Sequence, residues 1–330
     1  PKFTGRRVFH NIDLAELARF IDWGPFFQTW DLAGPYPAIL QDEVVGEQAR
    51  QVFADAQAML KKLIAEKWLT ASGVMGLWPA NAVGDDIVLW TDSRRQQVAL
   101  TWHGLRQQTE KQTYTDEHGQ ERLRPSRCLS DFVQPLSATE IEAARALFES
   151  AGGQKSFEFS TPIDHVGLFA VTAGLGVEAK EAEFVAAHDD YNAILFKALA
   201  DRLAEAAAEW LHWRVRTDLW GYAPQEALSN DELIAEKYQG IRPAPGYPAC
   251  PDHTAKTGLL ALLGASDIGM GLTESLAMTP AASVSGFYLS HPEATYFNVG
   301  PIGDDQVADM AARRHMPEDE LRRWLAPLLS

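Results

Sequence analysis

The sequence predicts an α+β protein with a mostly antiparallel sheet. Strand-like runs in the middle of the chain are joined by short turns, and helical patterns are grouped before and after them. The regular strand–helix–strand alternation typical of a parallel sheet is missing. The segments that could share a site lie far apart along the 330 residues. We therefore expect a single domain over residues 1–330, in which a twisted sheet is flanked by helices.

Two amphipathic helices are expected in the N-terminal part. The first covers residues 12–22, with Asp13 in position to cap it and Trp23-Gly24-Pro25 in position to end it. The second covers about 42–67. Apolar residues at helical spacing are, in the first helix, Leu14, Leu17, Phe20 and Ile21 and, in the second, Val45, Ala49, Val52, Phe53, Ala56, Leu60 and Leu63. Such stripes predict that one face of each helix packs on a core.

The apolar period then changes to that of strands. Strands are expected at Val74–Pro79, Asp86–Trp90, Gln97–Trp102 and Val166–Thr172. The second and third of these are joined by Thr91-Asp-Ser-Arg-Arg95, which predicts a hairpin. Residues 107–127 are polar and predict a loop, and Ala173-Gly-Leu-Gly176 predicts a turn.

The longest helical pattern runs from about 179 to 219. Its apolar residues recur at spacings of three to five and are Phe184, Tyr191, Leu195, Leu199, Leu203, Ala206, Trp210 and Val215. Ser229-Asn-Asp-Glu232 has the capping-box pattern that opens a short helix. Further elements are expected as a helix near 254–263, a hairpin of strands Ser283–Leu289 and Thr295–Val299, and helical structure over about 304–326.

Composition limits the classes of function. The net charge of −16 and the pI near 5.0 argue against nucleic acid or an anionic membrane as partner, because both require clustered Lys and Arg. The two cysteines, Cys128 and Cys250, are far apart and predict free thiols in a reducing compartment. No apolar run is long enough to span a bilayer, so we expect a cytoplasmic protein. The start at Pro1 is consistent with a fragment of a longer chain, although removal of an initiator Met would look the same.

Common catalytic motifs do not occur in the sequence. There is no Gly-x-Gly-x-x-Gly after a strand, no P-loop and no Gly-x-Ser-x-Gly. Gly174 and Gly176 lie too close together for a nucleotide-binding loop. His188-Asp189-Asp190 has no partners at metal-ligand i,i+4 spacing, and we interpret it as a solvated or capping cluster. We therefore expect neither a catalytic acid–base pair of these kinds nor a metal site.

The most informative segment is Arg242-Pro-Ala-Pro-Gly-Tyr-Pro-Ala-Cys-Pro-Asp-His253. Its four prolines fix φ and donate no amide hydrogen, so it predicts a stiff extended loop rather than a helix or a central strand. Rigid loops hold polar groups against a ligand at little ordering cost. Arg242 can form a two-point contact with a carboxylate. Taken alone, the segment is better explained by a surface turn with a solvated Arg, and the residues around it favour the ligand-binding interpretation.

Four further positions complete an inventory of candidate ligand-binding groups. Asp22 lies where a helix is expected to stop, Glu205 lies on the long helix, Glu236 precedes the Pro-rich loop, and Tyr296-Phe297 is expected at a strand start. For each carboxylate, simple surface exposure is an alternative. Together with Arg242, these groups suit a zwitterionic amino acid that also carries a cation and a heterocycle. The residues alone do not select S-adenosylmethionine among such zwitterions.

The chain resembles the C-terminal activation domain, which binds S-adenosylmethionine, of cobalamin-dependent methionine synthase. The resemblance runs nearly end to end, although the segments 112–127 and 137–161 are longer than in the family. It rests on Phe20-Ile-Asp-Trp-Gly-Pro-Phe-Phe27, Thr29-Trp30, Ile39-Leu-Gln-Asp-Glu-Val-Val-Gly46, Pro79-Ala-Asn-Ala-Val-Gly-Asp-Asp-Ile87, Leu105-Arg-Gln-Gln-Thr-Glu-Lys111, His188-Asp-Asp-Tyr-Asn192, Lys197-Ala-Leu-Ala-Asp-Arg-Leu-Ala-Glu-Ala206, Trp220-Gly-Tyr-Ala-Pro224, Tyr238-Gln-Gly-Ile-Arg-Pro-Ala-Pro-Gly-Tyr-Pro-Ala-Cys-Pro251 and Ala282-Ser-Val-Ser-Gly286.

The resemblance implies a set of ligand-binding positions. Carried over one at a time onto this chain, they fall on Asp22, Glu205, Glu236, Arg242, Ala244, Tyr247, Tyr296 and Phe297. At the last position the family pattern leads us to expect a second tyrosine. A hydroxyl contact is therefore lost at Phe297, whereas a ring or backbone contact remains available.

The resemblance also implies a function, that of a methyltransferase's reactivation module. We expect the chain to bind S-adenosylmethionine and to support reductive methylation of cob(II)alamin to methylcobalamin, which restores methyl transfer from 5-methyltetrahydrofolate to homocysteine. Cobalamin is expected on a separate domain, and the electron is expected from flavodoxin or a similar reductase. Neither catalytic residues nor a metal site are implied here. The alternative is a stand-alone module that binds S-adenosylmethionine or docks a corrinoid protein without transfer activity; an ordinary methyltransferase with a Gly-rich strand–turn–helix is disfavoured.

Overall fold

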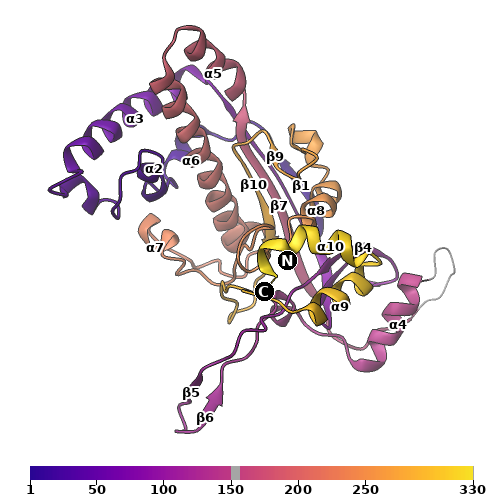
Figure 1. Cartoon of the computed structure of the whole chain (residues 1–330). Coiled ribbons are helices and arrows are strands. Elements are labelled where there is room, and N and C mark those ends of the chain that lie inside the picture. The colour runs from indigo at the N-terminus through magenta and orange to yellow at the C-terminus, as the bar shows by residue number, and fades with distance from the viewer. Residues whose placement is uncertain (150–156, 330) are drawn as a thin grey trace.

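A computed structural model describes residues 1–149 and 157–329 of the chain. Its centre is a sheet in the order β10-β7-β2-β3-β4, with β1 paired to β2 (Figure 1). The strands of this sheet are β1 (Gly5–Phe9), β2 (Thr70–Val83), β3 (Asp86–Trp90), β4 (Val98–His103), β7 (Asp164–Leu175) and β10 (Ser283–Tyr288). All pairings between these strands are antiparallel, so the predicted fold class is confirmed.

The two long strands β2 and β7 form the middle of the sheet. They pair from Thr70 opposite Leu175 to Ala80 opposite Asp164. The other edge of β2 is shared, because β1 pairs with its first half and β3 with its last residues. β3 and β4 form the hairpin that the sequence predicts, and β3 has the predicted bounds.

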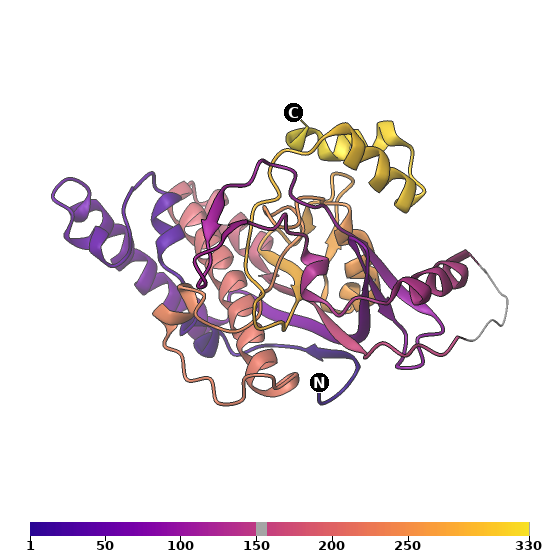
Figure 2. The ribbon, with the colours of Figure 1, turned by 90° about the horizontal axis from the view of Figure 1, so that it is seen from below.

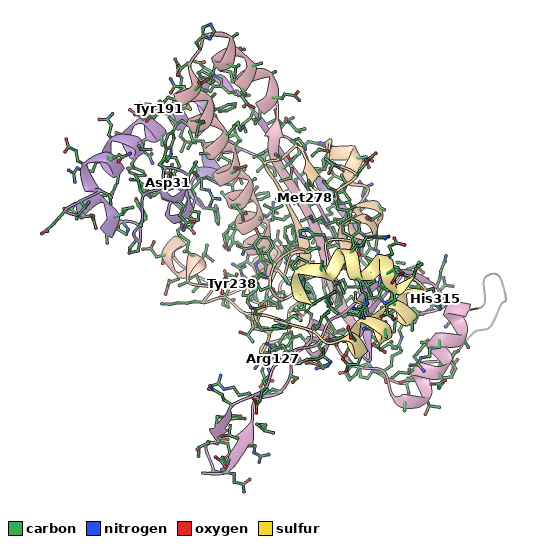
Figure 3. All side chains as sticks on the ribbon, viewed as in Figure 1. Asp31, Arg127, Tyr191, Tyr238, Met278 and His315 are labelled. Carbon is green, nitrogen blue, oxygen red and sulfur yellow. The ribbon has the colours of Figure 1, made fainter. Side chains whose placement is uncertain are left out.

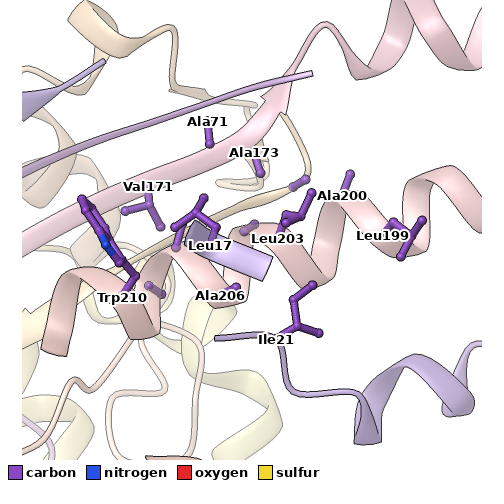
Figure 4. Close-up of a cluster of buried hydrophobic side chains, with 14 of the residues drawn as sticks. Leu17, Ile21, Ala71, Val171, Ala173, Leu199, Ala200, Leu203, Ala206 and Trp210 are labelled. Atoms are coloured by element: carbon purple, nitrogen blue, oxygen red, sulfur yellow. The ribbon is translucent and has the colours of Figure 1, made fainter. Parts of the chain in front are cut away.

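Both faces of the sheet are buried. Phe169, Val171 and Ala173 of β7 belong to one apolar cluster, and Leu168 and Ala170 belong to the cluster on the opposite face. Figure 4 shows the first cluster, in which Val171 and Ala173 lie beside the long helix α6. Burial on both faces explains why this strand is an almost continuous apolar run in the sequence.

Ten α-helices lie in the described part of the chain. They are α1 (Leu14–Ala18), α2 (Gly24–Gln28), α3 (Gly46–Glu66), α4 (Ala138–Glu149), α5 (Val177–Ala186), α6 (Asp190–Arg214), α7 (Asn230–Ile234), α8 (Ala255–Leu263), α9 (Asp304–Arg314) and α10 (Glu318–Leu325). Asp13 caps α1 by accepting a hydrogen bond from the Ala15 N–H, at 2.9 Å. Ser229 and Glu232 form the predicted capping box of α7.

The long helix begins later than the sequence predicts. α6 continues into a π-helical turn at Val215–Leu219, whereas α5 is a separate helix. The chain breaks between them at His188, whose φ of 55° is left-handed. The Asp189 carboxylate then accepts a hydrogen bond from the Asn192 N–H and caps α6. The cluster of residues 188–190 thus has the capping role that was one of its two interpretations.

The prediction of a strand at Thr295–Val299 is wrong. The first strand of the predicted hairpin is present as β10. Residues 295–299, predicted as the second strand, form no strand and pair with no strand of the sheet. Their backbone instead contacts the Pro-rich loop, since the Val299 N–H donates to the Pro248 carbonyl at 2.9 Å. The apolar residues of this segment therefore face the loop and a cavity, as described below.

Several segments extend from the central body. β5 (Thr113–Thr115) and β6 (Glu121–Leu123) form a small hairpin in the segment predicted as a loop, and Figure 1 shows it projecting from the sheet. A second small pair is β8 (Gly271–Leu272) with β9 (Met278–Thr279). Figures 1 and 2 place α3 and α4 at opposite ends of the molecule. Of the long segment 137–161, residues 150–156 lie outside the described residues.

The structure places both cysteines in the interior of the protein. Cys128 and Cys250 are buried and free, as predicted. Burial raises the pKa of the Cys128 thiol to about 11. Over residues 1–149 and 157–329, no helix combines the length and the apolar character that a membrane span requires.

Candidate functional site

The Pro-rich loop is held along the edge strand β10. Ile241 and Leu289 exchange backbone hydrogen bonds at 2.9 and 3.0 Å, and the Phe287 N–H donates to the Pro243 carbonyl at 2.9 Å. Gly286 makes this approach possible, because a Cβ at that position would lie 2.4 Å from the Pro243 oxygen. The first residues of the loop are therefore fixed to the sheet although prolines limit their own hydrogen bonding.

The middle of the loop is a tight turn. Gly246 has a φ of +95°, and its N–H donates to the Cys250 carbonyl at 2.7 Å. Tyr247 donates to the Ala244 carbonyl and accepts from the Cys250 N–H, at 3.1 and 2.9 Å. These bonds leave the backbone little freedom, which agrees with the stiff loop that the sequence predicts.

Arg242 is held by a buried polar network. Its Nη2 donates to a Glu209 carboxylate oxygen at 2.8 Å. Its Nη1 lies 3.1 Å from Nδ1 of His212 and donates to the Tyr238 hydroxyl at 3.3 Å. Its backbone N–H donates to the Tyr296 hydroxyl at 2.9 Å. Burial alone would lower the pKa of Arg242, but Glu209, Tyr238 and Tyr296 together raise it by more, so this guanidinium stays charged.

His212 is neutral in this network. Burial and the nearby charges of Arg216 and Arg242 hold the pKa of His212 well below its usual range. Because a guanidinium only donates, Nδ1 of His212 must accept the bond from Arg242, which places the imidazole proton on Nε2. Among the described residues, neither that Nε2 nor Glu209 Oε1 has a hydrogen-bond partner.

A cavity of about 450 Å³ opens beside Arg242. Apolar walls come from Phe169 of β7 and Val284 of β10. All predicted site residues except Asp22 line it, namely Glu205, Glu236, Arg242, Ala244, Tyr247, Tyr296 and Phe297. Segments more than 90 residues apart in the sequence thus meet at one place. Tyr238, labelled in Figure 3, lies next to Arg242 and marks the position of this cavity in the molecule. A volume of this size suits a small organic ligand.

Two carboxylates of this cavity have no cationic partner. In the described part of the chain, Glu205 and Glu236 form no ion pair. Burial raises the pKa of each, and the charge of Arg242 opposes both shifts. Glu236 also has a left-handed φ of 56°, which is uncommon for a residue with a side chain. Glu205 is half-buried and Glu236 is exposed. Two carboxylates that line one cavity without an ion-pair partner among the described residues fit a cationic ligand.

Asp22 lies near the cavity but does not line it. Burial is the main cause of the raised pKa of Glu205, and the negative charge of Asp22 adds to the shift. Its Oδ1 accepts a hydrogen bond from the Gly24 N–H at 2.9 Å and so fixes the turn that opens α2. The structure therefore shows a local structural role for Asp22, whose charge also acts on Glu205.

The aromatic residues occupy different parts of the site. Tyr247 is 56% exposed, which places its ring at the mouth of the cavity. Tyr296 is deeper, and its hydroxyl lies 3.0 Å from that of Tyr238. Phe297 contributes a ring without a hydroxyl, and its centroid lies 6.5 Å from that of Phe132. Tyr247 thus forms the exposed aromatic part of the site, and Tyr296 forms its inner part.

Sequence reasoning missed Glu209, His212 and Tyr238. The sequence assigned no role to Glu209, but its side chain is buried. The available signal was spacing, because Glu205, Glu209 and His212 recur at i, i+4 and i+7 and so share one stripe of α6. Only the fold shows that this stripe faces Arg242.

Two comparisons with known proteins bear on this site. Residues 13–315 match the family model described as the activation domain of vitamin B12-dependent methionine synthase. The chain belongs to this family. A crystal structure of the MetH reactivation domain bound to AdoHcy is similar to this activation domain at 49% sequence identity and a TM-score of 0.85. That alignment covers 100% of this chain and 93% of the other.

Methionine synthase is a methyltransferase, and the resemblance found in the sequence is confirmed by these comparisons. The activation domain described here has the expected mostly antiparallel sheet and long helix. In the described ranges 1–149 and 157–329, no group of three or more His, Cys, Asp or Glu is arranged to hold a metal ion.

Proposed function

We propose that this activation domain binds S-adenosylmethionine in the Arg242 cavity and thereby supports reductive methylation of cob(II)alamin to methylcobalamin. The observation that carries the proposal is the charge arrangement of that cavity, with one fixed guanidinium and two unpartnered carboxylates. It is supported by the similar reactivation domain, whose crystal structure contains AdoHcy. S-Adenosylmethionine differs from AdoHcy by a methyl group and a positive charge on sulfur.

Arg242 is the residue proposed to bind the ligand's carboxylate. A guanidinium has five N–H groups, and the described partners use the two on Nη1 and one on Nη2. The N–H on Nε and the second N–H on Nη2 remain for a two-point contact. Because Glu209, His212 and Tyr238 already fix the guanidinium plane, little side-chain entropy is lost when the ligand binds.

The carboxylates and aromatic rings are proposed to hold the rest of the ligand. Glu205 and Glu236, with Asp22 nearby, attract the ammonium and sulfonium charges. The Tyr247 ring at the cavity mouth can face the sulfonium through a cation–π contact.

The adenine end of the ligand requires a planar slot and backbone hydrogen bonds. We propose that Ala244 offers backbone groups in the rigid turn and that the rings of Tyr296 and Phe297 flank the base. The hydroxyl that a second tyrosine would supply at position 297 is not needed for such ring contacts.

The sulfonium supplies an already activated methyl group, so the chain requires no general acid or base. What this chain contributes is orientation and exclusion of water around the ligand. We therefore assign binding residues and no catalytic residues. These residues can contribute to the reaction rate by holding the methyl donor in a fixed position.

The remaining partners follow from the same proposal. Cobalamin is held by the cobalamin-binding domain of methionine synthase, and flavodoxin or a similar reductase supplies the electron. The chain acts as one unit over residues 1–330, in the cytoplasm. The alternative is a binding module without transfer activity. Mixing the chain with a cob(II)alamin-loaded partner domain, a reductant and S-adenosylmethionine separates the two, because only the activation function produces the methylcobalamin spectrum.

Calorimetry with S-adenosylmethionine tests the assigned cavity. We expect Arg242→Ala to weaken binding by about 1.5–3 kcal/mol, because a charge-assisted contact is lost. Arg242→Lys keeps the positive charge but loses the two-point contact of the guanidinium, so its affinity should lie between those of Arg242→Ala and the unchanged protein.

Arg313→Ala is the matched control. The Arg313 side chain is 20% exposed and paired with Asp86 outside the cavity, whereas that of Arg242 is 19% exposed. Thermal unfolding of all variants reports any general loss of structure. Unchanged affinity in a folded Arg242→Ala variant, or an equal loss in the Arg313 control, would reject the assigned cavity.

A further inference from the structure

A second cavity, of about 560 Å³, lies beside the Arg242 cavity. The two cavities share Tyr296 and Phe297 in their walls. The second is otherwise built from the base of the β5–β6 hairpin, where Arg127 lies as labelled in Figure 3. Its cationic side chains are Lys111, Arg124 and Arg127, and it has no acidic residue in its lining. We call it the basic cavity.

These three cations have no acidic partner in the part of the chain that the structure describes. Lys111 donates to the Oε1 of Gln107 at 2.7 Å, and the Arg127 guanidinium lies 5.9 Å from the centre of the Phe132 ring. No ion pair involves Lys111, Arg124 or Arg127. Like charges gathered without a counter-charge repel one another, and a bound anion relieves that repulsion.

Neighbouring arginines show that this lack of partners is not a general property of the segment. Arg122 on β6 binds Asp116 at 2.7 Å. Arg106 binds Asp85 and Asp131, each at 2.7 Å. Carboxylates are therefore available close by in the sequence, yet none faces the basic cavity. The net charge of the chain is −16, yet three cations without an acidic partner among residues 1–149 and 157–329 gather around one cavity.

The basic cavity has a built floor. Gln107 exchanges hydrogen bonds with Arg127, since its N–H donates to the Arg127 carbonyl at 3.0 Å and its Oε1 accepts from the Arg127 N–H at 3.1 Å. Its Nε2 donates to the Asn298 carbonyl at 2.6 Å. One side chain thus joins the hairpin base, Lys111 and the segment that carries Phe297. This framework fixes the backbone of Arg127 and gives the Lys111 ammonium an acceptor, while the guanidinium groups of Arg124 and Arg127 can adjust.

Aromatic rings complete the wall. Tyr114 of β5 is 41% exposed, and it lines the cavity together with Tyr296 and Phe297. Exposed rings beside guanidinium groups offer stacking surfaces for a planar heterocycle. The combination of rings and cations therefore points to a ligand that has both a flat ring and an anionic group.

We propose that the basic cavity binds a nucleoside monophosphate or a closely similar phosphorylated planar ligand. Arg124, Arg127 and Lys111 contact the phosphate, and Tyr114 stacks on the ring. An acidic protein surface fits less well, because the outer part of the hairpin carries Asp116, Glu117 and Glu121. The hairpin's Arg122 is paired with Asp116, whereas the three cations without a described acidic partner line the cavity, which is the size of a small ligand.

Titration with uridine monophosphate, followed by NMR or calorimetry, tests this site. Uridine and inorganic phosphate serve as probes of the ring alone and of the anion alone. A pyrimidine nucleotide is used because the Arg242 cavity is proposed to take an adenine ligand. We expect saturable binding of uridine monophosphate, at least about tenfold tighter than that of either single-part probe, and weakening as the salt concentration rises.

The variants are Arg124→Gln combined with Arg127→Gln, and Lys111→Gln as a separate variant. Each should weaken binding of uridine monophosphate, the double variant by about tenfold or more. Arg122→Gln is the matched control, since Arg122 is on the same hairpin but does not line the cavity; its effect should stay within about twofold. Thermal unfolding confirms that each variant is folded.

Several outcomes would overturn the proposal. They are a lack of saturable binding, uridine binding as tightly as its monophosphate, inorganic phosphate binding as tightly as the nucleotide, and equal losses in the Arg122 control. Binding of polyglutamate but not of the nucleotide would assign the surface to an acidic protein instead. The titrations contain no S-adenosylmethionine, so failure here leaves the proposed function untouched, and failure of the proposed function leaves this test intact.

Discussion

The two cavities that share Tyr296 and Phe297 manage charge in opposite ways. In the Arg242 cavity the only cation in the lining is paired with buried Glu209, and two carboxylates have no ion pair with a described residue. In the basic cavity three cations have no described acidic partner, and Arg124 is exposed. The first arrangement fixes a side chain before a ligand arrives, whereas the second leaves long side chains free to adjust.

This difference has consequences for binding. A guanidinium held by Glu209, His212 and Tyr238 presents its remaining donors in one orientation, which favours selection by shape. Exposed cations act mainly through charge and are screened by salt. We therefore expect structural damage from changes in the first cavity and salt-dependent affinity changes from the second.

The largest expected effect is on the stability of the buried pair. Glu209→Ala leaves Arg242 largely buried without its counter-charge, which should lower the free energy of unfolding by about 3–5 kcal/mol. Arg127→Ala on the other side of the shared wall should change it by less than about 0.5 kcal/mol. Chemical denaturation of both variants measures the contrast. Equal and small losses would show that the Arg242 pair is not a stabilising unit.

The next effect is a pH dependence of ligand affinity. Burial raises the pKa of Glu205, with Arg202 and Arg242 opposing the shift and Asp201 and Asp22 adding to it. Glu205 therefore takes up a proton at a higher pH than a free glutamate does. If its ionised form binds the ligand's positive charge, affinity for S-adenosylmethionine is full above this raised pKa and falls as the pH drops through it.

The stability contribution of Glu205 runs in the opposite direction, because a raised pKa favours the folded state at low pH and this contribution is lost as the pH rises. Glu205→Gln should weaken binding at neutral pH by about tenfold and flatten the affinity–pH curve. Asp201→Asn, one turn away and outside the lining, should keep the fall in affinity but move it to lower pH, because the charge of Asp201 contributes to the raised pKa of Glu205. Calorimetry over a pH series measures both. A wild-type curve that Glu205→Gln leaves unaltered would remove Glu205 from the site.

Most residues that line the Arg242 cavity were named through the family resemblance, whereas local motifs predict only the shape of the segments that carry them. Prolines and glycines predict the loop of residues 242–253. The Trp23-Gly24-Pro25 motif predicts the turn that Asp22 precedes. Such features are local, so their geometry follows from the chain itself. The sheet was predicted for the same reason, since β3 and β4 are joined by a short turn.

The parts that could not be predicted depend on distant contacts. Thr295–Val299 has strand-like residues, but its backbone contacts Pro248, and its rings face two cavities rather than a sheet. Glu209 has the sequence context of an exposed helical glutamate, and only Arg242, 33 residues away, makes it a buried one. The helix break at His188 could not be predicted, because the residues around it are all compatible with a continuous helix.

The smallest expected effect is at the shared wall itself. Phe297→Tyr adds the hydroxyl that the family pattern leads us to expect, at the edge of a ring that lines both cavities. If Phe297 contributes only ring contacts, affinity for S-adenosylmethionine should change by less than about 0.5 kcal/mol. Calorimetry at matched pH checks this. A gain of tenfold or more would show that a hydroxyl contact is missing from this chain.

A crystal structure of the chain with S-adenosylmethionine tests the central claim most directly. The account predicts ligand density in the Arg242 cavity, with the ligand's carboxylate at the free donors of Arg242 and its positive charges towards Glu205 and Glu236. Density for the ligand at any other place, with the Arg242 cavity left empty at saturating concentration, would contradict it.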